Sequence, residues 1–215
     1  MTIAIREAGP DDASFLAWVM LAASRSHLAY GLWEHFVSGS EENCLAFLRM
    51  ISITKIPHLF HYTTFLIAEE DGKSVAGLSC YDPSALGMAA FSQALPEVFE
   101  IMGWATEDQK AAGRRIKPYL QCMADDAPNT WVIESVAAVP EMRRHGIINM
   151  LLHEAITRGK AKGFKRAQIS VFTGNTPARN AYEKCGFRFA DEKHTPEFEA
   201  LCGDYGIARL LLEFD

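Results

Sequence analysis

A basic turn between an apolar run and an amphipathic segment is the part of the sequence best suited to chemistry. The apolar run 131–139 ends at Pro140, and Arg143, Arg144 and Gly146 follow before a helical pattern begins. The first backbone N–H groups of a helix have no partner within it, and the helix dipole adds partial positive charge. Gly146 lacks a Cβ, so a phosphate could approach the backbone closely. The turn is therefore predicted to bind an anion.

The charge of the surrounding residues supports this prediction. Residues 143–166 hold seven Lys and Arg side chains against Glu154 alone, a local charge of +6, whereas the whole chain carries −6. A solvated helix face with ordinary loop charges is the alternative interpretation of such a basic run. His145, inside the turn, either adds positive charge at low pH or faces solvent. The acidic balance of the whole chain argues against a general nucleic-acid binder.

A second pattern follows one predicted strand later. Residues 175–187 read Asn-Thr-Pro-Ala-Arg-Asn-Ala-Tyr-Glu-Lys-Cys-Gly-Phe. This segment resembles the Asn-x-x-Ala-x-x-x-Tyr-x-x-x-Gly-Phe signature of the GCN5-related N-acetyltransferases, the GNAT family. The turn at 140–148 is similar to the acyl-CoA loop of the same family, and the two motifs stand in the expected order. The close resemblance covers about residues 130–190.

The resemblance implies a binding mode for acetyl-CoA, the expected cosubstrate, without a metal. Acyl-CoA would lie in a wedge between two splayed parallel strands, residues 131–139 and 167–172. Backbone groups of Val136, Ala137 and Ala138 would pair with the pantetheine arm. The pyrophosphate would be held by N–H groups of the turn: Arg143, Arg144, His145, Gly146, Ile147 and Ile148.

Three positions near this site allow more than one role. Ile148 stands where the family usually has Gly or Ala, so its branched side chain either crowds the loop or turns into the core. Asn175 either caps the following helix or hydrogen-bonds the cofactor. Asn180 lies one turn further, within possible reach of the pantetheine.

Two side chains are predicted to move protons. Tyr182 matches the family's tyrosine that protonates the departing thiolate; core packing is the alternative role. An unperturbed phenol has a pKa near 10 and a thiol near 8.5, so placement beside the sulfur must assist the transfer. Glu134 interrupts an apolar strand, and desolvation would raise its pKa toward the range of a base that deprotonates an ammonium group. An ion pair with an arginine, or a solvent-facing position, is the alternative for Glu134.

These residues require a mixed α/β fold in one domain, residues 1–215. Alternating or apolar patterns predict strands at 2–7, 63–69, 74–81, 131–139, 167–172, 187–191 and 208–214. Helices are expected from Asp11 or Asp12 to about Ser26, and at 41–51, 144–162 and 177–184, with a helical insertion at about 82–129. Asp71-Gly72 predicts a hairpin, whereas 131–172 reads as a parallel crossover. The sheet is therefore mixed and mostly antiparallel, with flanking helices and a GNAT-like acyl-CoA acyltransferase architecture.

The predicted activity is transfer of an acetyl or other acyl group from acyl-CoA to a primary amine by direct attack. The insertion at 82–129 holds seven acidic and four basic side chains, and such a lid slightly favours a cationic small molecule. Tyr30, Trp33, His35 and Phe36 either wall the acceptor pocket or pack the insertion. An acyl-CoA-binding sensor without turnover is the alternative function.

The composition of the sequence and the lack of targeting patterns in it indicate where in the cell the protein is expected. The sequence shows no signal-peptide pattern and no apolar run long enough to span a membrane. Five cysteines without a Cys-x-x-Cys pair indicate neither a disulfide framework nor a zinc site, which fits a cytoplasmic protein. His58 and His61 supply only two potential metal ligands. A homodimer is an expectation from the family alone.

Overall fold

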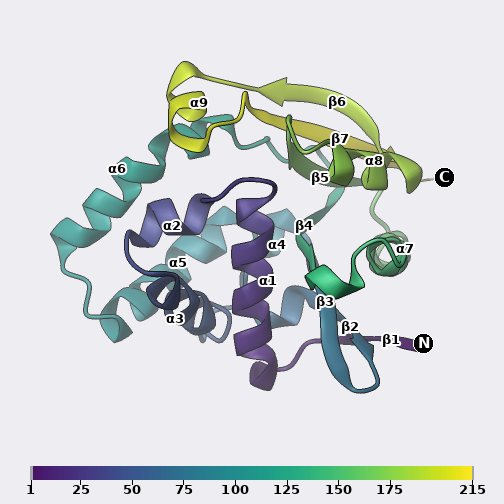
Figure 1. Cartoon of the computed structure of the whole chain (residues 1–215), viewed down its shortest axis with the longest axis horizontal. Helices are drawn as coiled ribbons and strands as arrows, with labels where there is room; N and C mark the ends of the chain where they lie inside the picture. The colour runs from purple at the N-terminus through teal and green to yellow at the C-terminus, as the bar shows by residue number, and fades with distance from the viewer. Residues whose placement is uncertain (1, 215) are drawn as a thin grey trace.

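The computed structural model describes residues 2–214, which form a mixed sheet flanked by helices on both faces (Figure 1). The strand order is β1-β2-β3-β4-β5-β7-β6, and each neighbouring pair is antiparallel except β4 and β5. The strands are β1 (Ile3–Glu7), β2 (Phe65–Glu70), β3 (Lys73–Tyr81), β4 (Thr130–Ala138), β5 (Arg166–Phe172), β6 (Arg188–Lys193) and β7 (Ile207–Glu213). The predicted fold class is confirmed.

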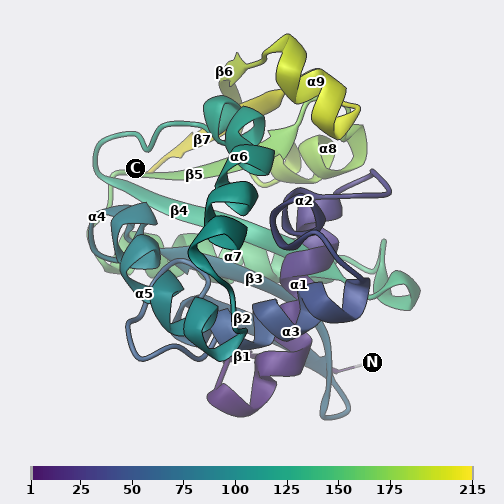
Figure 2. The same cartoon turned by 90° about the vertical axis from the view of Figure 1, so that its left-hand side faces the viewer.

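Helices divide between the two faces of the sheet and enclose separate cores. The helices are α1 (Ala13–Arg25), α2 (Leu32–Val37), α3 (Glu41–Ile51), α4 (Pro83–Leu86), α5 (Met88–Ile101), α6 (Thr106–Cys122), α7 (Ile147–Ala161), α8 (Thr176–Lys184) and α9 (Pro196–Cys202). One core lies between the sheet and helices α1, α2, α3, α5 and α6, which stand in front of the strands in Figure 2. The other lies between the sheet and helices α7 and α8. Successive side chains of β4 point to opposite faces of the sheet and so contribute to both cores. Val132 joins the first core, whereas Trp131 and Ile133 join the second.

Local chemistry explains several element boundaries. Asp71 and Gly72 both have left-handed backbone angles, φ 50° and 76°, as the hairpin turn between β2 and β3 requires. The side chain of Ser40 accepts a hydrogen bond from the Asn43 N–H and caps α3. Gly163 has φ 84° directly after the last turn of α7.

The structure differs from the sequence-based expectation in three places. Residues 27–57 contain the short helix α2, where no helix was expected before residue 41. Helix α7 begins at Ile147 instead of residue 144, because Arg144 and Gly146 have left-handed angles that no helix accepts. Helix α9 lies between the two closing strands.

Strands β4 and β5 pair only over their first halves. Residues Thr130 to Ile133 lie opposite Arg166 to Ile169, and no pairing follows. Beyond that point β4 stays beside β3, while β5 stays beside β7 through Phe172. The register between β3 and β4 shifts between Gly77 and Ser79, and Ser135 has φ 51°, the mark of a bulge that bends β4. A wedge therefore opens between the parallel strands.

The predicted insertion is helical. Its residues form α4, α5 and α6, which lie over the same face as α1. Across residues 2–214, none of the helices combines the length and the apolar character that crossing a bilayer demands.

Candidate active site

A cavity of about 880 Å³ occupies the wedge. Its walls include β4 from Glu134 to Ala138, β5 from Gln168 to Phe172, the turn before α7 and the inner side of α8. It also extends across the sheet to residues of α1, α2, α5 and α6. Of the residues predicted to bind the cofactor or to catalyse, His145 is not part of the wall; the others line this one cavity.

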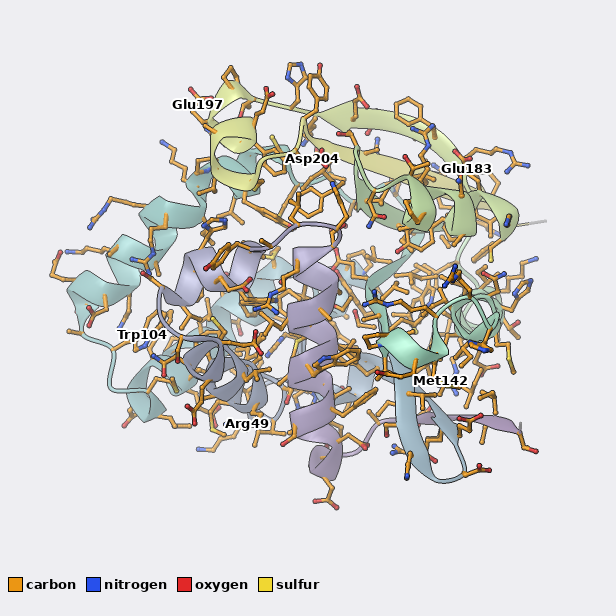
Figure 3. The ribbon with its side chains drawn as sticks, in the orientation of Figure 1. Arg49, Trp104, Met142, Glu183, Glu197 and Asp204 are labelled. Atoms are coloured by element: carbon orange, nitrogen blue, oxygen red, sulfur yellow. The ribbon has the colours of Figure 1, made fainter. Side chains whose placement is uncertain are left out.

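The turn between β4 and α7 presents free backbone donors. Figure 3 shows Met142 on this turn, and the N–H groups of residues 144–149 have no hydrogen-bond acceptor within the described chain. Gly146 has φ 80°, and a Cβ there would meet no atom within 4 Å, so the backbone is open to a ligand. Arg143 and Arg144 are exposed beside it, and Arg143 Nε donates to the carbonyl of Ala138 at 3.3 Å. The turn therefore has the donors, the charge and the open approach of an anion site.

Ile148 and His145 take distinct positions in this turn. Ile148 is half-buried, packs against the core beneath α7 and also lines the cavity. The His145 side chain is exposed, and its Nδ1 lies 2.9 Å from the carbonyl oxygen of Arg143. The N–H of His145 is among the free donors, although the residue is not part of the cavity wall.

Glu134 lies where β4 leaves β5, and its side chain lines the cavity. Its Oε2 accepts a hydrogen bond from the Tyr81 hydroxyl at 3.0 Å. Burial raises the pKa of Glu134 from 4.5 to about 7; the Asp126 charge adds to the rise, and the Tyr81 hydrogen bond opposes it. No arginine pairs with Glu134 among the described residues, and the half-buried side chain faces the cavity. The group can accept a proton near neutral pH.

Tyr182 lies on α8 and is 7% exposed. Its ring packs in the core beneath α7 and also lines the cavity. Burial raises the pKa of its hydroxyl above the ordinary value of 10, and none of the side-chain hydrogen bonds found among residues 2–214 involves it. The phenol is therefore protonated at neutral pH, as a proton donor must be.

The two predicted asparagines differ in their contacts. Asn175 Oδ1 accepts from the Ala178 N–H at 3.2 Å and caps α8, which confirms the capping role. Its Nδ2 donates to Ser26 Oγ at 2.6 Å and ties α8 to the end of α1. Asn180 is exposed on α8, at the cavity wall.

Residues distant in sequence complete the other side of the cavity. Tyr81 and Tyr119 both line the cavity. The register of β3 and the packing of the insertion bring them there, so no local sequence motif predicts either residue. The predicted aromatic wall divides: Trp33 lines the cavity, whereas Phe36 packs against Trp104 of the insertion at a ring distance of 5.6 Å. Tyr30 is 65% exposed and lines no part of it.

A buried carboxylate holds this side in place. Asp204, labelled in Figure 3, accepts from Thr173 Oγ1 at 2.6 Å and from the Gly174 N–H at 3.0 Å. It also lies 3.2 Å from His27 Nε2, which joins the loop after α1 to the end of β5. His27 thus lines the cavity with its ring nitrogen already engaged.

Solved structures share this architecture. An acetyltransferase structure is 20% identical, with a TM-score of 0.72 over 99% of this chain and 100% of the other. An N-acetyltransferase from Staphylococcus aureus Mu50 is 15% identical, with a TM-score of 0.69 over 97% and 100% of the two chains. The PaiA N-acetyltransferase from Thermoplasma acidophilum, solved in complex with coenzyme A, is 17% identical, with a TM-score of 0.56 over 100% of each chain.

Sequence comparison identifies the family. The model of the Acetyltransferase (GNAT) family matches residues 31–187, which include the wedge, the turn before α7 and α8. No curated protein matches the chain. The protein therefore belongs to the GNAT acetyltransferase family and is an acyl-CoA-dependent N-acetyltransferase.

Proposed function

We propose that the protein transfers an acetyl group from acetyl-CoA to the primary amine of a small molecule. The observation that supports this most strongly is the pair of proton-transfer groups in one cavity. Glu134, at the point where the two parallel strands separate, has a pKa of about 7, and Tyr182 of α8, which lines the same cavity, stays protonated. Six free N–H groups at the start of α7 provide a place for a pyrophosphate at the edge of the same cavity.

The chain fits acetyl-CoA at several points. The side of β4 that faces β5 has no paired strand beyond Ile133, so backbone groups of Val136, Ala137 and Ala138 can bind the pantetheine arm as an added strand. Arg143 and Arg144 flank the phosphate position with positive charge. Asn180 is the side chain of α8 that we place against the pantetheine. Relatives with this fold have been solved with coenzyme A.

Each catalytic group then has a defined task. Glu134 accepts a proton from the substrate ammonium, which frees the nitrogen lone pair to attack the thioester carbonyl. A backbone N–H of β4 near Val136 donates to the carbonyl oxygen as it gains negative charge. Tyr182 donates its proton to the leaving sulfur, and the second proton lost by the acylated nitrogen restores the phenol. One N–C bond forms and one C–S bond breaks, and the acyl group goes directly to the amine.

A small-molecule acceptor is favoured by the cover over the cavity. Helices α4, α5 and α6 lie on the side where the Glu134 carboxylate meets Tyr81, and residues from this segment line the cavity. Such a covered site suits a compact amine better than a protein tail. The five cysteines are all free, which supports a reducing compartment such as the cytoplasm.

Two measurements test this proposal. Coenzyme A at 100 times its Kd should stabilise the fold by about 2.7 kcal/mol, or raise the Tm by about 5–10 °C. Thiol release from acetyl-CoA should then rise with at least one member of a primary-amine panel. A shift with ATP and none with coenzyme A would exclude the proposed site. A shift with coenzyme A but no amine-dependent release would instead indicate an acyl-CoA sensor.

A further inference from the structure

The acceptor side of the cavity is largely apolar and aromatic. We define it as the wall on the face of α1, formed by Leu32, Trp33, Phe60, Tyr81, Met88 and Tyr119. Trp33 and Phe60 meet edge to face, with ring centroids 4.9 Å apart. Tyr81 brings this wall to the catalytic carboxylate through its hydrogen bond to Glu134. A substrate amine bound at Glu134 therefore has its carbon body against apolar side chains.

The carboxylates beside this wall favour a cation. Glu134 and Asp126 line the cavity here, and both are carboxylates. The nearby guanidinium of Arg209 binds Asp191 and is not part of the cavity wall. The imidazole of His27 already faces the buried carboxylate of Asp204. An ammonium group is thus attracted to this side of the cavity, whereas a carboxylate would be repelled.

Positive side chains gather at the opposite end of the cavity. Among the described residues that line it, the Lys and Arg side chains are Arg143, Arg144 and Lys184. The first two belong to the turn before α7, and Lys184 ends α8. These positions flank the proposed cofactor site, so the wall defined above offers no cation to pair with an acidic substrate group.

We infer that the acceptor is a primary amine with an apolar or aromatic body and no carboxylate group. This inference rests on the proposed function, because it assigns the acceptor of the same reaction. It separates simple arylalkylamines and alkylamines from amino acids, which carry the same amino group beside a carboxylate. The apolar wall favours binding of an apolar or aromatic substituent on the amine. A substrate carboxylate is disfavoured, because the wall has no cation to pair with it.

The test uses the full-length protein, acetyl-CoA and three amines. 2-Phenylethylamine and phenylalanine differ only by the carboxylate, and ethanolamine keeps the amine but has a small polar body. We expect kcat/KM for 2-phenylethylamine to exceed that for each of the other two by at least about tenfold. Equal or better turnover of phenylalanine, or of ethanolamine, would overturn the inference.

A matched pair of variants tests the electrostatic cause. Met88 lies at the cavity, starts α5 and is 43% exposed, so Met88→Lys adds a cation with little disturbance. Ile101 is 60% exposed at the other end of α5, about 20 Å away, and Ile101→Lys adds the same charge there. Met88→Lys should reduce the preference for 2-phenylethylamine over phenylalanine at least threefold, and Ile101→Lys should leave it unchanged. Equal ratios in both variants would refute the charge argument.

Two further outcomes separate this inference from the proposed function. If no amine accelerates thiol release although coenzyme A raises the Tm, the proposed function fails and this inference falls with it. If amines react but octanoyl-CoA donates faster than acetyl-CoA to 2-phenylethylamine, the apolar wall holds the acyl chain. That result would overturn the inference while the transferase activity stands.

Discussion

Replacing Glu134 with glutamine should make the protein more stable at alkaline pH and less active. The pKa of Glu134 rises from 4.5 to about 7 on folding, chiefly by burial, so the native state holds this proton more tightly than the unfolded chain. Ionisation of Glu134 therefore lowers the free energy of unfolding as the pH rises from about 4.5 through 7. At 1.36 kcal/mol per pKa unit the full effect is roughly 3 kcal/mol, and solvent in the open cavity reduces it to about 1–2 kcal/mol.

Glu134→Gln cannot ionise, so it avoids this loss of stability, and it keeps an oxygen that accepts the Tyr81 hydrogen bond. Thermal melts at pH 8 should therefore give a Tm about 2–8 °C above that of the wild type, and melts at pH 5 should give nearly equal values. The control is Glu192→Gln on edge strand β6, where the side chain is exposed and the substitution should change neither value. In the same preparation kcat should fall by about 10²–10⁴-fold. A Glu134→Gln variant that is no more stable than the wild type at pH 8 would refute the reasoning.

Four other outcomes follow from the site. Tyr182→Phe should lower kcat by about 10²–10⁴-fold in a thiol-release assay, while the Tm shift with coenzyme A persists. Gly146→Ala should cost about 1 kcal/mol in thermal melts, because φ is 80°, and should weaken coenzyme A binding measured by calorimetry. Arg144→Asn, which tolerates the left-handed φ of 66°, should weaken coenzyme A binding about threefold to tenfold and reduce its salt dependence. The wild-type kcat/KM should rise with pH as Glu134 loses its proton, reach half its maximum near pH 7 and level about one pH unit higher.

Contrary results would identify which part of the site is misassigned. Full activity of Tyr182→Phe would show that Tyr182 does not donate the proton to the leaving sulfur. Unchanged coenzyme A affinity in both Gly146→Ala and Arg144→Asn would place the phosphates elsewhere. A kcat/KM that is flat from pH 5 to 9 would show that Glu134 is not the base.

The sequence predicts the segment from β4 to α8 well, because residues close in sequence mark where its strand and helices begin and end. Pro140 ends the strand, Gly163 follows the helix with a left-handed angle, and Asn175 caps the next helix. Helix α2 was not predicted because it has only six residues. Four of them are buried, so the sequence shows no alternation of polar and apolar faces: Trp33, Glu34, Phe36 and Val37. Helix α9 carries a local signal in the sequence, because Thr195 precedes a proline and caps the helix by accepting from the Phe198 N–H.

The acceptor side was less accessible to sequence reasoning. Tyr81 meets Glu134 only because of the register between β3 and β4, and the bulge at Ser135 has no sequence signature. Tyr119 reaches the same cavity through the packing of α6, far from either motif. The divergence of β4 and β5 was itself expected from the family resemblance and not from the residues of the strands.

A crystal structure of the protein with coenzyme A tests the central claim most directly. The account predicts the pyrophosphate on the N–H groups at the start of α7, the pantetheine arm along residues 135–138 of β4, and the sulfur within reach of the Tyr182 hydroxyl. A cofactor bound outside the space between β4 and β5, or phosphates distant from Gly146, would contradict it.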